Sequence, residues 1–378
     1  MTAPNPDDDF SRSVYCVLGV PVDDITMPRL VARIHQAASK REPLFISTPN
    51  LNYVMLSQRD PAFRLSLLES DVCPADGVGV LLICRFLRIP IAARVAGSDL
   101  PEALRTIQTS DGKGLRVTLL GGAPGVGELA RRTINAGDTG RLLCVAAIDP
   151  GVVAPDKLDD PATVELINAT RADFLMVALG AQKGQAWLVR NRSRLTVPAV
   201  SHLGATVNFL AGAVRRAPEG MRRLGLEWLW RIKEEPKLAP RYLSDGCRLA
   251  WLLISRILPL RLWLRRVASN AGAEGGGVWL DTEQPKYCRI VIAGNLDDGR
   301  LAPVVEAFRS AALSGRDVRL DFGRLKSFGM AFAGQVLMLE KCLQRQGRSL
   351  QIVGAAATVS RVLEWCGLGH LKSGDGKA

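Results

Sequence analysis

The chain has 378 residues, of which 47% are apolar and 23% are charged. This exceeds the length of one ordinary small domain, and the apolar content is too high for a disordered chain, so two domains are expected. Lysine and arginine outnumber aspartate and glutamate by 49 to 37, which favours an anionic partner such as nucleic acid, a phosphorylated substrate or an acidic membrane face. The eight cysteines show no C-x-x-C spacing. This argues against a zinc cage or a disulfide framework and fits a reducing cytoplasm.

Residues 1–13 are predicted to form a disordered polar tail, without the basic start and apolar core of a secretory signal. Asp7 and Asp9 formally spell D-x-D, a metal–nucleotide motif of some transferases, but in such a tail they are expected to be solvated charges. No other D-x-D occurs in the sequence, which therefore predicts no metal site. The longest apolar stretch, 249–264, contains two arginines and a proline and is too short to predict a membrane span.

Short apolar runs alternate with longer amphipathic runs over residues 14–215. The apolar runs predict strands at 44–47, 115–120, 142–148, 173–179 and 198–203. Between them the sequence predicts helices that include 26–40, 61–70, 125–136 and 184–194. Continuous apolar strands that alternate with helices predict a parallel α/β sheet covered on both faces. Function in such a sheet collects in the loops beyond the carboxyl ends of the strands.

The composition becomes basic and rich in tryptophan over residues 216–267. Lysines and arginines interleave there with Trp228, Trp230, Trp251 and Trp263. Amphipathic helices of this kind suit an anionic membrane surface, because indoles sit at the headgroup level and cations meet acidic lipid. The alternative is a helical hairpin that packs on the sheet and leaves a solvated basic face.

A second compact unit is predicted at the carboxyl end, over residues 286–373. It follows a stretch rich in glycine and alanine, 268–285, which predicts a linker. Three strands are expected in the unit, each followed by a helix: 288–293 and 301–314, 317–322 and 331–346, 349–353 and 357–366. The unit is therefore a small α/β domain.

Two loops of the first domain carry side chains suited to a sugar nucleotide, one after a predicted strand and one before an apolar helix. The loop 48–52 offers Thr48, Asn50 and Asn52, whose hydroxyl and carboxamide groups can hold a ribose, uracil or sugar. An asparagine–proline turn with a helix cap explains this loop equally well. Asp76 lies in a tight glycine-containing loop, where it could deprotonate a sugar hydroxyl or simply cap a helix.

Further glycines and a cation follow along the chain. Gly121 and Gly122 lie between a strand and a helix, where a backbone without side chains can approach a pyrophosphate. The motif is not G-x-G-x-x-G, and alone it identifies no nucleotide. Arg94 supplies a cation for phosphate, with Asp99 as its positioner or as a cap. Gly204 opens another glycine loop. His202, just before it, is expected to be a core or hydrogen-bonded histidine.

Taken together, these loops resemble the WecG/TagA/CpsF family of bacterial glycosyltransferases. The matching pieces are TPN at 48–50, ADGVG at 75–79, RVAGSDL at 94–100, LLGGAPGV at 119–126, GATVNFLAG at 204–212, RRAP at 215–218 and GLEWLWRIKEEPKLAPRY at 225–242. Their joint order covers about residues 14–245. The resemblance implies a Rossmann-like domain over 14–215 and, over 216–267, a mobile basic appendage that closes the site and meets the membrane.

The resemblance also implies an activity. It is the transfer, with inversion, of a hexosyl or N-acetylhexosaminyl group from a UDP-sugar to a polyprenyl-diphosphate-linked saccharide in cell-surface polysaccharide synthesis. By motif, Asp76 resembles the catalytic base, Thr48 a sugar-contacting residue and Arg94 a motif arginine. Three appendage arginines resemble those that meet the diphosphate: Arg216, Arg231 and Arg241. No metal, cofactor or nucleic acid is expected, and the protein should lie peripherally on the cytoplasmic face of the bacterial inner membrane.

One stretch departs from the G-x-P-x-Q-E-x-W pattern of that family. Residues 180–187 read GAQKGQAW, so Gly184 stands in place of the glutamine and Gln185 in place of the glutamate. Gln182 or Gln185 could supply the missing carboxamide from a shifted loop. The donor sugar is therefore not implied by the resemblance, and a catalytically inactive scaffold or regulator is the rival interpretation.

The C-terminal unit resembles a STAS domain, the fold of anti-sigma-factor antagonists. The match rests on the order of its elements and on residues 318–322, VRLDF, which lead to a loop and a helix. In that family the helix begins at an Asp-Ser-Ser-Gly-like motif with a phosphorylated hydroxyl. Here residues 327–332 read SFGMAF, with no hydroxyl at the matching place. The unit is therefore expected to be a docking or oligomerisation module that binds a protein partner or a second copy, and not a phospho-switch.

Overall fold

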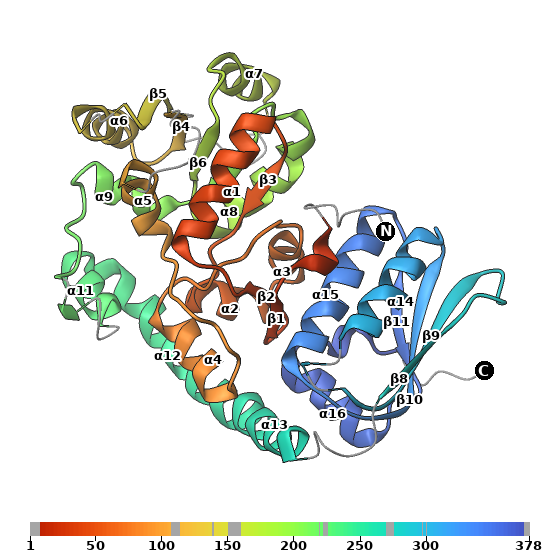
Figure 1. Ribbon diagram of the computed structural model, residues 1–378. Coiled ribbons are helices and arrows are strands. Elements are labelled where there is room, and N and C mark those ends of the chain that lie inside the picture. The colour runs from red at the N-terminus through yellow and green to blue at the C-terminus, as the bar shows by residue number, and fades with distance from the viewer. Residues whose placement is uncertain are drawn as a thin grey trace.

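The computed structural model describes the chain from residue 8 to residue 373 with internal gaps. The described ranges are 8–106, 114–137, 140–149, 160–218, 220–221, 226–269, 276–296, 298–299 and 301–373. Figure 1 shows an α/β unit formed by the first part of the chain, a long helical rod along one side of the molecule, and a second α/β unit at the carboxyl end.

Within these ranges, five parallel strands form the central sheet in the order β3-β7-β6-β4-β5. They are β3 (Leu44–Ile46), β4 (Leu115–Gly121), β5 (Leu142–Ile148), β6 (Phe174–Ala178) and β7 (Ala199–His202). Each overlaps an apolar run that predicted a strand, and the parallel α/β prediction is confirmed. The runs are continuous because helices cover both faces of the sheet.

Alternate residues of β6 point into two different helical layers. Phe174 and Met176 pack with the helices of one face, which are α1 (Met27–Lys40), α5 (Leu100–Thr106), α6 (Val126–Ala136) and α9 (Gly204–Leu210). Leu175 and Val177 pack with Trp187 on the other face, under α7 (Pro161–Ala169) and α8 (Ala181–Asn191). This period of two is that of a strand buried on both sides.

A hairpin and three helices lie between the sheet and the C-terminal unit. The hairpin pairs β1 (Val14–Val17) with β2 (Val20–Asp23) through Leu18 and Gly19, both at positive φ, as a two-residue hairpin turn requires. The helices are α2 (Leu51–Ser57), α3 (Pro61–Leu68) and α4 (Val78–Leu87). Their apolar side chains belong to the same core as those of the C-terminal unit.

The appendage contains α11 (Glu227–Glu234), α12 (Ala239–Leu252) and α13 (Leu258–Ser269). A π-helical turn over Leu253–Ile257 joins the last two into the rod of Figure 1. Pro259, which cannot donate a backbone hydrogen bond and crowds the preceding turn, accounts for this irregularity. The rod packs on α2, α4 and the C-terminal unit, so the alternative of a hairpin packed on the sheet is wrong. In the part of the chain described, no helix is both long and apolar enough to cross a bilayer.

The C-terminal unit has a four-stranded sheet, counted over the described residues, in the order β11-β10-β9-β8. Its strands are β8 (Gly277–Asp281), β9 (Tyr287–Leu296), β10 (Asp317–Phe328) and β11 (Leu350–Val353). Its helices are α14 (Ala302–Leu313), α15 (Met330–Arg345) and α16 (Ala357–Cys366). Strand β8 pairs antiparallel with β9 and lies inside the stretch predicted to be a linker. That part of the linker prediction is wrong, because β9 supplies backbone partners to a glycine-rich segment.

The prediction of a solvated tail is also wrong for residues 8–13. Asp9 begins a short 3-10 helix, and its carboxylate lies 2.7 Å from Nζ of Lys341 and 3.0 Å from Nη1 of Arg12. Asp8 forms an ion pair with Arg309 at 2.6 Å. These half-buried aspartates are therefore partners of the C-terminal unit, and Arg309 and Lys341 stand some 300 residues further along the chain. Asp7 lies outside the described residues.

Candidate active site

Backbone hydrogen bonds bring the predicted site loops together around Asp76. The Asp76 N–H donates to the carbonyl oxygen of Pro49 at 2.9 Å, and the Val95 N–H donates to that of Ala75 at 2.9 Å. The Asp76 carboxylate accepts a hydrogen bond from the Gly97 N–H. The loops 48–50, 74–77 and 94–99 are thereby held as one assembly beside the carboxyl ends of β3 and β7.

The Asp76 carboxyl group lies in a desolvated place. Part of the residue remains accessible, but protein atoms surround the carboxyl group, and this burial raises its pKa to about 7. The Gly97 N–H and the charge of Arg94 lower the pKa, while Glu227 and Asp99 raise it. A carboxyl group with a pKa near neutrality is suited to take up and release a proton at physiological pH.

Thr48 lies directly beside this assembly and is buried. Gly97 fits closely between Thr48 and the β7 loop, since a Cβ there would lie 3.1 Å from Oγ1 of Thr48 and 2.7 Å from Cδ2 of Leu203. Asn50 has a different role, because its side chain caps α2 by accepting a hydrogen bond from the Tyr53 N–H at 3.1 Å. Asn52 lies half-buried on the first turn of the same helix.

Arg94, Asp99, Arg216 and Glu227 form a charged cluster over the loop 94–99. Asp99 bridges the two arginines: Nη2 of Arg94 lies 3.4 Å from its carboxylate, and Arg216 donates to its other oxygen. Arg216 also donates to Oγ of Ser98 at 2.9 Å. Glu227, the first residue of α11, lies 3.9 Å from Arg94. The cluster thus links the appendage to the loop 94–99, whose Gly97 N–H binds the Asp76 carboxylate.

Glu227 was not among the residues predicted for the site. It stands in the EW pair of the motif at 225–242, which was the available signal. Arg231, one turn further along α11, stacks over the ring of Phe209 at 5.4 Å and lies 3.5 Å from Glu235. The side chain of Arg241 lies outside the described residues.

Gly121 and Gly122 lie at the end of β4, beside the end of β6. The chain runs from β4 outward to β5 and then back to β6, so the strand order reverses at this crevice. Ligands of open α/β sheets bind at such a point. Both glycines have positive φ, and a Cβ on Gly121 would lie 2.8 Å from the carbonyl oxygen of Ala178. Packing against β6 therefore requires glycine at position 121 even without a ligand.

The departure at Gly184 has a structural explanation in His202. A Cβ on Gly184 would overlap the imidazole ring of His202, which lies at the end of β7. The ring also lies close to Gly204, whose Cβ would be 3.3 Å from Nε2. Since both glycines face the same ring, a histidine at 202 and a glycine at 184 are complementary in volume. The packing of the His202 ring therefore requires glycine at position 184.

His202 belongs to a buried group of polar side chains beneath the site loops. Its Nδ1 is 2.7 Å from the hydroxyl of Tyr53, and desolvation lowers its pKa to about 4, so the ring is neutral at pH 7. It is thus a hydrogen-bonded core histidine, as predicted.

The two glutamines proposed to replace the missing carboxamide lie apart from each other. Gln185 is buried and donates to Oγ of Ser47 at 2.6 Å. The amide of Gln182 is exposed and donates to Asp60 at 2.8 Å. Each side-chain amide group already has a protein partner, Gln185 in the core below the loops and Gln182 at the start of α3.

Comparisons with known proteins agree with this arrangement. Residues 15–262 match the model of the "Glycosyl transferase WecG/TagA/CpsF family", and residues 279–373 match that of the "Mlab, STAS domain". A similar protein is the N-acetylglucosaminyldiphosphoundecaprenol N-acetyl-beta-D-mannosaminyltransferase of Staphylococcus aureus strain MRSA252. It is 28% identical over 219 residues, which are 57% of this chain and 82% of the relative. The same-named proteins of strains NCTC 8325 and COL match with equal identity and coverage. The chain therefore belongs to the WecG/TagA/CpsF family of glycosyltransferases and carries a STAS domain at its carboxyl end.

Proposed function

We propose that the protein transfers a hexosyl or N-acetylhexosaminyl group from a UDP-sugar to a polyprenyl-diphosphate-linked saccharide, with inversion, in the synthesis of a bacterial cell-surface polysaccharide. The observation that carries this proposal is the desolvated Asp76 carboxyl group, with a pKa of about 7, beside an arginine cluster. The names of the S. aureus relatives, which specify an undecaprenyl-diphosphate-linked acceptor, support the acceptor class.

In this reaction Asp76 is the general base. An acceptor hydroxyl attacks the anomeric carbon, its proton passes to the carboxylate, and the bond between that carbon and the UDP oxygen breaks. A single displacement of this kind inverts the anomeric centre. General-base catalysis is typically worth about 10²–10⁴ in rate.

Arg94 and Arg216 are the groups proposed to stabilise the diphosphate as it leaves. Guanidinium groups bind phosphate oxygens in a bidentate manner, and charge that develops on a leaving group is often the largest target of catalysis. In the structure Asp99 and Glu227 neutralise these arginines. A diphosphate would exchange carboxylate partners for phosphate ones, so the cluster is kept in place before the substrate arrives.

The transfer is proposed to need no divalent metal. Within the described ranges, no three His, Cys, Asp or Glu side chains come together as a metal site. EDTA is expected to leave the rate unchanged, whereas Arg94→Ala is expected to lower kcat by about tenfold or more. A reaction that stops with EDTA and returns with magnesium or manganese would contradict the arginine account.

The rod of α12 and α13 is proposed to rest on the anionic cytoplasmic face of the inner membrane. One stripe of the rod, with α4 beside it, exposes large apolar side chains: Leu82, Phe86, Leu243, Trp251, Ile254, Leu258 and Leu262. Arg248 and Arg265 are exposed on the same two helices. Apolar side chains that enter the headgroup region, with cations near acidic lipid, support peripheral binding where a lipid-linked acceptor lies.

The proposal is tested with purified full-length protein, a panel of UDP-sugars and polyprenyl-diphosphate-linked acceptors, with the products measured by mass spectrometry. A product heavier by one hexosyl or N-acetylhexosaminyl unit is expected with at least one donor, and Asp76→Asn serves as the inactive control. No product with any donor, together with intact binding of UDP, would favour the inactive scaffold. The departure at residues 180–187 is the feature that supports that scaffold, and this assay decides between the two functions.

A further inference from the structure

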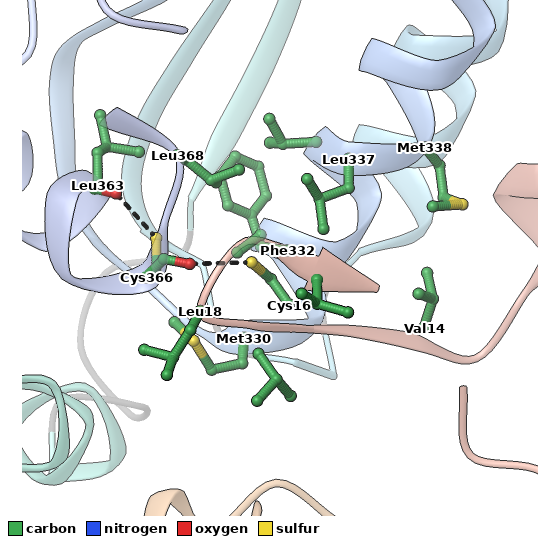
Figure 2. Packing of buried hydrophobic residues seen from close by; sticks show 14 of the residues in the cluster. Val14, Cys16, Leu18, Met330, Phe332, Leu337, Met338, Leu363, Cys366 and Leu368 are labelled. Atoms are coloured by element: carbon green, nitrogen blue, oxygen red, sulfur yellow. Dashed lines mark hydrogen bonds between the residues drawn. The ribbon is translucent and has the colours of Figure 1, made fainter. Parts of the chain in front are cut away.

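The STAS domain is joined to the transferase unit through helix α15. This helix is buried along nearly its whole length, as expected of a core helix and not of a free docking face. Gly334 lets β1 approach closely, since a Cβ there would overlap the carbonyl oxygen of Val14. Figure 2 shows the same interface further along: Cys16, on β1, donates to the carbonyl oxygen of Cys366 at 3.2 Å, next to Phe332 of α15.

Lys341 of α15 is a fully buried cation in this interface. Its Nζ lies 2.7 Å from Asp9, 2.9 Å from the carbonyl oxygen of Ser70 and 3.5 Å from Asp71. Burial alone would raise the pKa of Asp9, but the positive charges of Lys341 and Arg12 outweigh it and hold that pKa below its usual value. Burial lowers the pKa of Lys341 itself. A buried charge of this kind is tolerated only with such partners.

Two of the partners of Lys341, Ser70 and Asp71, lie on the segment that leads to Asp76. Arg12 bonds to the Ser70 carbonyl oxygen at 2.9 Å and to the Asp23 carboxylate at 2.8 Å. Asp23 in turn accepts from the Cys73 N–H, and its own N–H donates to the Cys73 carbonyl oxygen at 2.8 Å. Cys73 stands three residues before Asp76. A continuous chain of hydrogen bonds therefore connects the STAS domain to the catalytic loop.

The same segment also fixes the strand that carries Thr48. Asp71 accepts from the Phe45 N–H at 2.7 Å, and the Ser47 N–H donates to the Val72 carbonyl oxygen at 3.1 Å. The hydroxyl groups of Ser47 and Ser70 are 2.7 Å apart. Residues 70–73 thus hold both site loops, and Lys341 holds residues 70–71.

We propose that Lys341 is a positioning residue for the transferase reaction, through which the STAS domain fixes the loop of Asp76. The STAS domain then stabilises the active-site loops from within the same chain, and the buried helix α15 is not available to an outside partner. Only the kinetic test of this inference rests on the proposed function. Asp9 and Asp71 share two cations of α15, the buried Lys341 and the half-exposed Arg345, which lies 3.8 Å and 3.5 Å from their carboxylates. Without Lys341 they lose the buried one, together with its bond to the Ser70 carbonyl oxygen, and the segment 69–76 can move away from α15.

The test compares Lys341→Met with Glu340→Gln in the full-length protein. Methionine keeps the length of the side chain and removes the charge. Glu340 is the adjacent residue on α15, and its carboxylate binds Arg64 and His370, so its variant also weakens the interface but leaves the bonds of Lys341 to residues 70–71 in place. A displacement of about 1 Å at a reacting group can cost as much as 10² in rate.

For Lys341→Met we expect kcat to fall at least tenfold and the donor KM to change less than threefold. We also expect the acidic limb of the pH–rate profile to move to lower pH, because water that reaches the Asp76 carboxyl group lowers its pKa. Glu340→Gln is expected to keep kcat within threefold and the limb in place. Wild-type kinetics in Lys341→Met, or equal losses in both variants, would overturn the proposal.

A second readout is independent of activity. Hydrogen exchange of the backbone amides of Val72, Cys73, Ala75 and Asp76 is expected to be at least tenfold faster in Lys341→Met than in the wild type, with no such change in Glu340→Gln. If no donor gives product, this measurement alone decides the positioning, so the two proposals fail separately. Should Lys341→Met not fold, Asp9→Asn, which keeps the shape and removes one charge partner, is expected to accelerate the same amides. Unchanged exchange in a folded variant would contradict the inference.

Discussion

The burial of the Asp76 carboxyl group determines the pH range in which it can act as a base. The carboxyl group must be ionised to accept a proton, and desolvation raises its pKa to about 7. Below that pH the group is protonated and cannot act as a base, so kcat/KM is expected to rise with pH and to level off above an apparent pKa near 7. Initial rates measured between pH 5 and pH 9 define this acidic limb of the pH–rate profile.

The Asp76→Asn variant checks the assignment of that limb. The amide keeps the shape of the side chain but cannot take up the proton, so kcat is expected to fall by about 10²–10⁴. Binding of UDP is expected to stay within a few fold. A variant that retains near-normal turnover, or an acidic limb with an apparent pKa near 4 in the wild type, would remove Asp76 from its role.

Gly184 and His202 are expected to be energetically coupled. Gly184→Ala places a methyl group in overlap with the Cδ2 edge of the imidazole ring of His202, and overpacking of this kind typically costs about 1–3 kcal/mol. His202→Ala costs stability through the lost ring and its bond to Tyr53. The double variant is expected to be more stable than the sum of the two single losses predicts, because the smaller side chain makes room for the methyl group. Denaturant unfolding of the four proteins measures the coupling, and strict additivity would refute it.

Part of this residue-level picture was predictable. The sequence placed Thr48 in a loop after a predicted strand and Asp76, Arg94 and Asp99 in motif loops, and the structure brings those loops together. The burial of Gln185 and the capping role of Asn50 depend on packing partners that no local pattern specifies. Glu227 was missed because its partner, Arg94, lies far away in the sequence.

At the scale of elements, apolar periodicity predicted the central sheet to within one or two residues for each strand. The hairpin of β1 and β2 was missed because its turn, Leu18-Gly19, lacks the Asn-Gly or Asp-Gly signal. Strand β8 was missed because glycines depress strand propensity. Both elements are specified by tertiary partners, α15 in one case and β9 in the other.

The exposed stripe of the rod leads to a prediction about membrane binding. Trp251 and Ile254 are 64% and 73% exposed on it. A Trp251→Ser, Ile254→Ser double variant loses the apolar area that would enter the bilayer, and at about 25 cal/mol per Å² its affinity for phosphatidylglycerol vesicles is expected to fall tenfold or more. Sedimentation with vesicles measures this.

Leu313, on α14 of the STAS domain, supplies the matched control. It is 88% exposed, so Leu313→Ser removes a similar surface group away from the rod and is expected to leave vesicle binding unchanged. Raised salt should weaken wild-type binding, because the arginines act on anionic lipid through screened charge. Equal losses in both variants, or binding that ignores lipid charge and salt, would contradict the assignment of the rod to the membrane.

One of the three apolar cores of the described residues crosses the predicted domain boundary. Val14 and Leu67 of the transferase unit, Trp263 of the rod and Phe332 of the STAS domain belong to the same cluster. Composition predicted two units joined by a linker, but not that they share a core, since the contacts join residues hundreds of positions apart. The expectation of a docking module came from the resemblance to a STAS domain that lacks a hydroxyl at the phosphorylation place, and it remains a prediction.

A chain that ends at Ser269 tests the shared core. The truncation removes the STAS domain, and it uncovers β1, the buried face of the rod and the cations and carboxylates left without partners, Arg12 and Asp9 among them. Such an exposed surface is expected to make the truncated protein aggregate. The loss of buried apolar area is expected to lower its melting temperature by several degrees or to abolish a cooperative unfolding transition. Co-expression with residues 270–378 as a separate chain is expected to restore a soluble complex that elutes as one species. A truncated protein that is monomeric and melts at the wild-type temperature would show that the two units are thermodynamically independent, because a shared core cannot lose half of its members without cost.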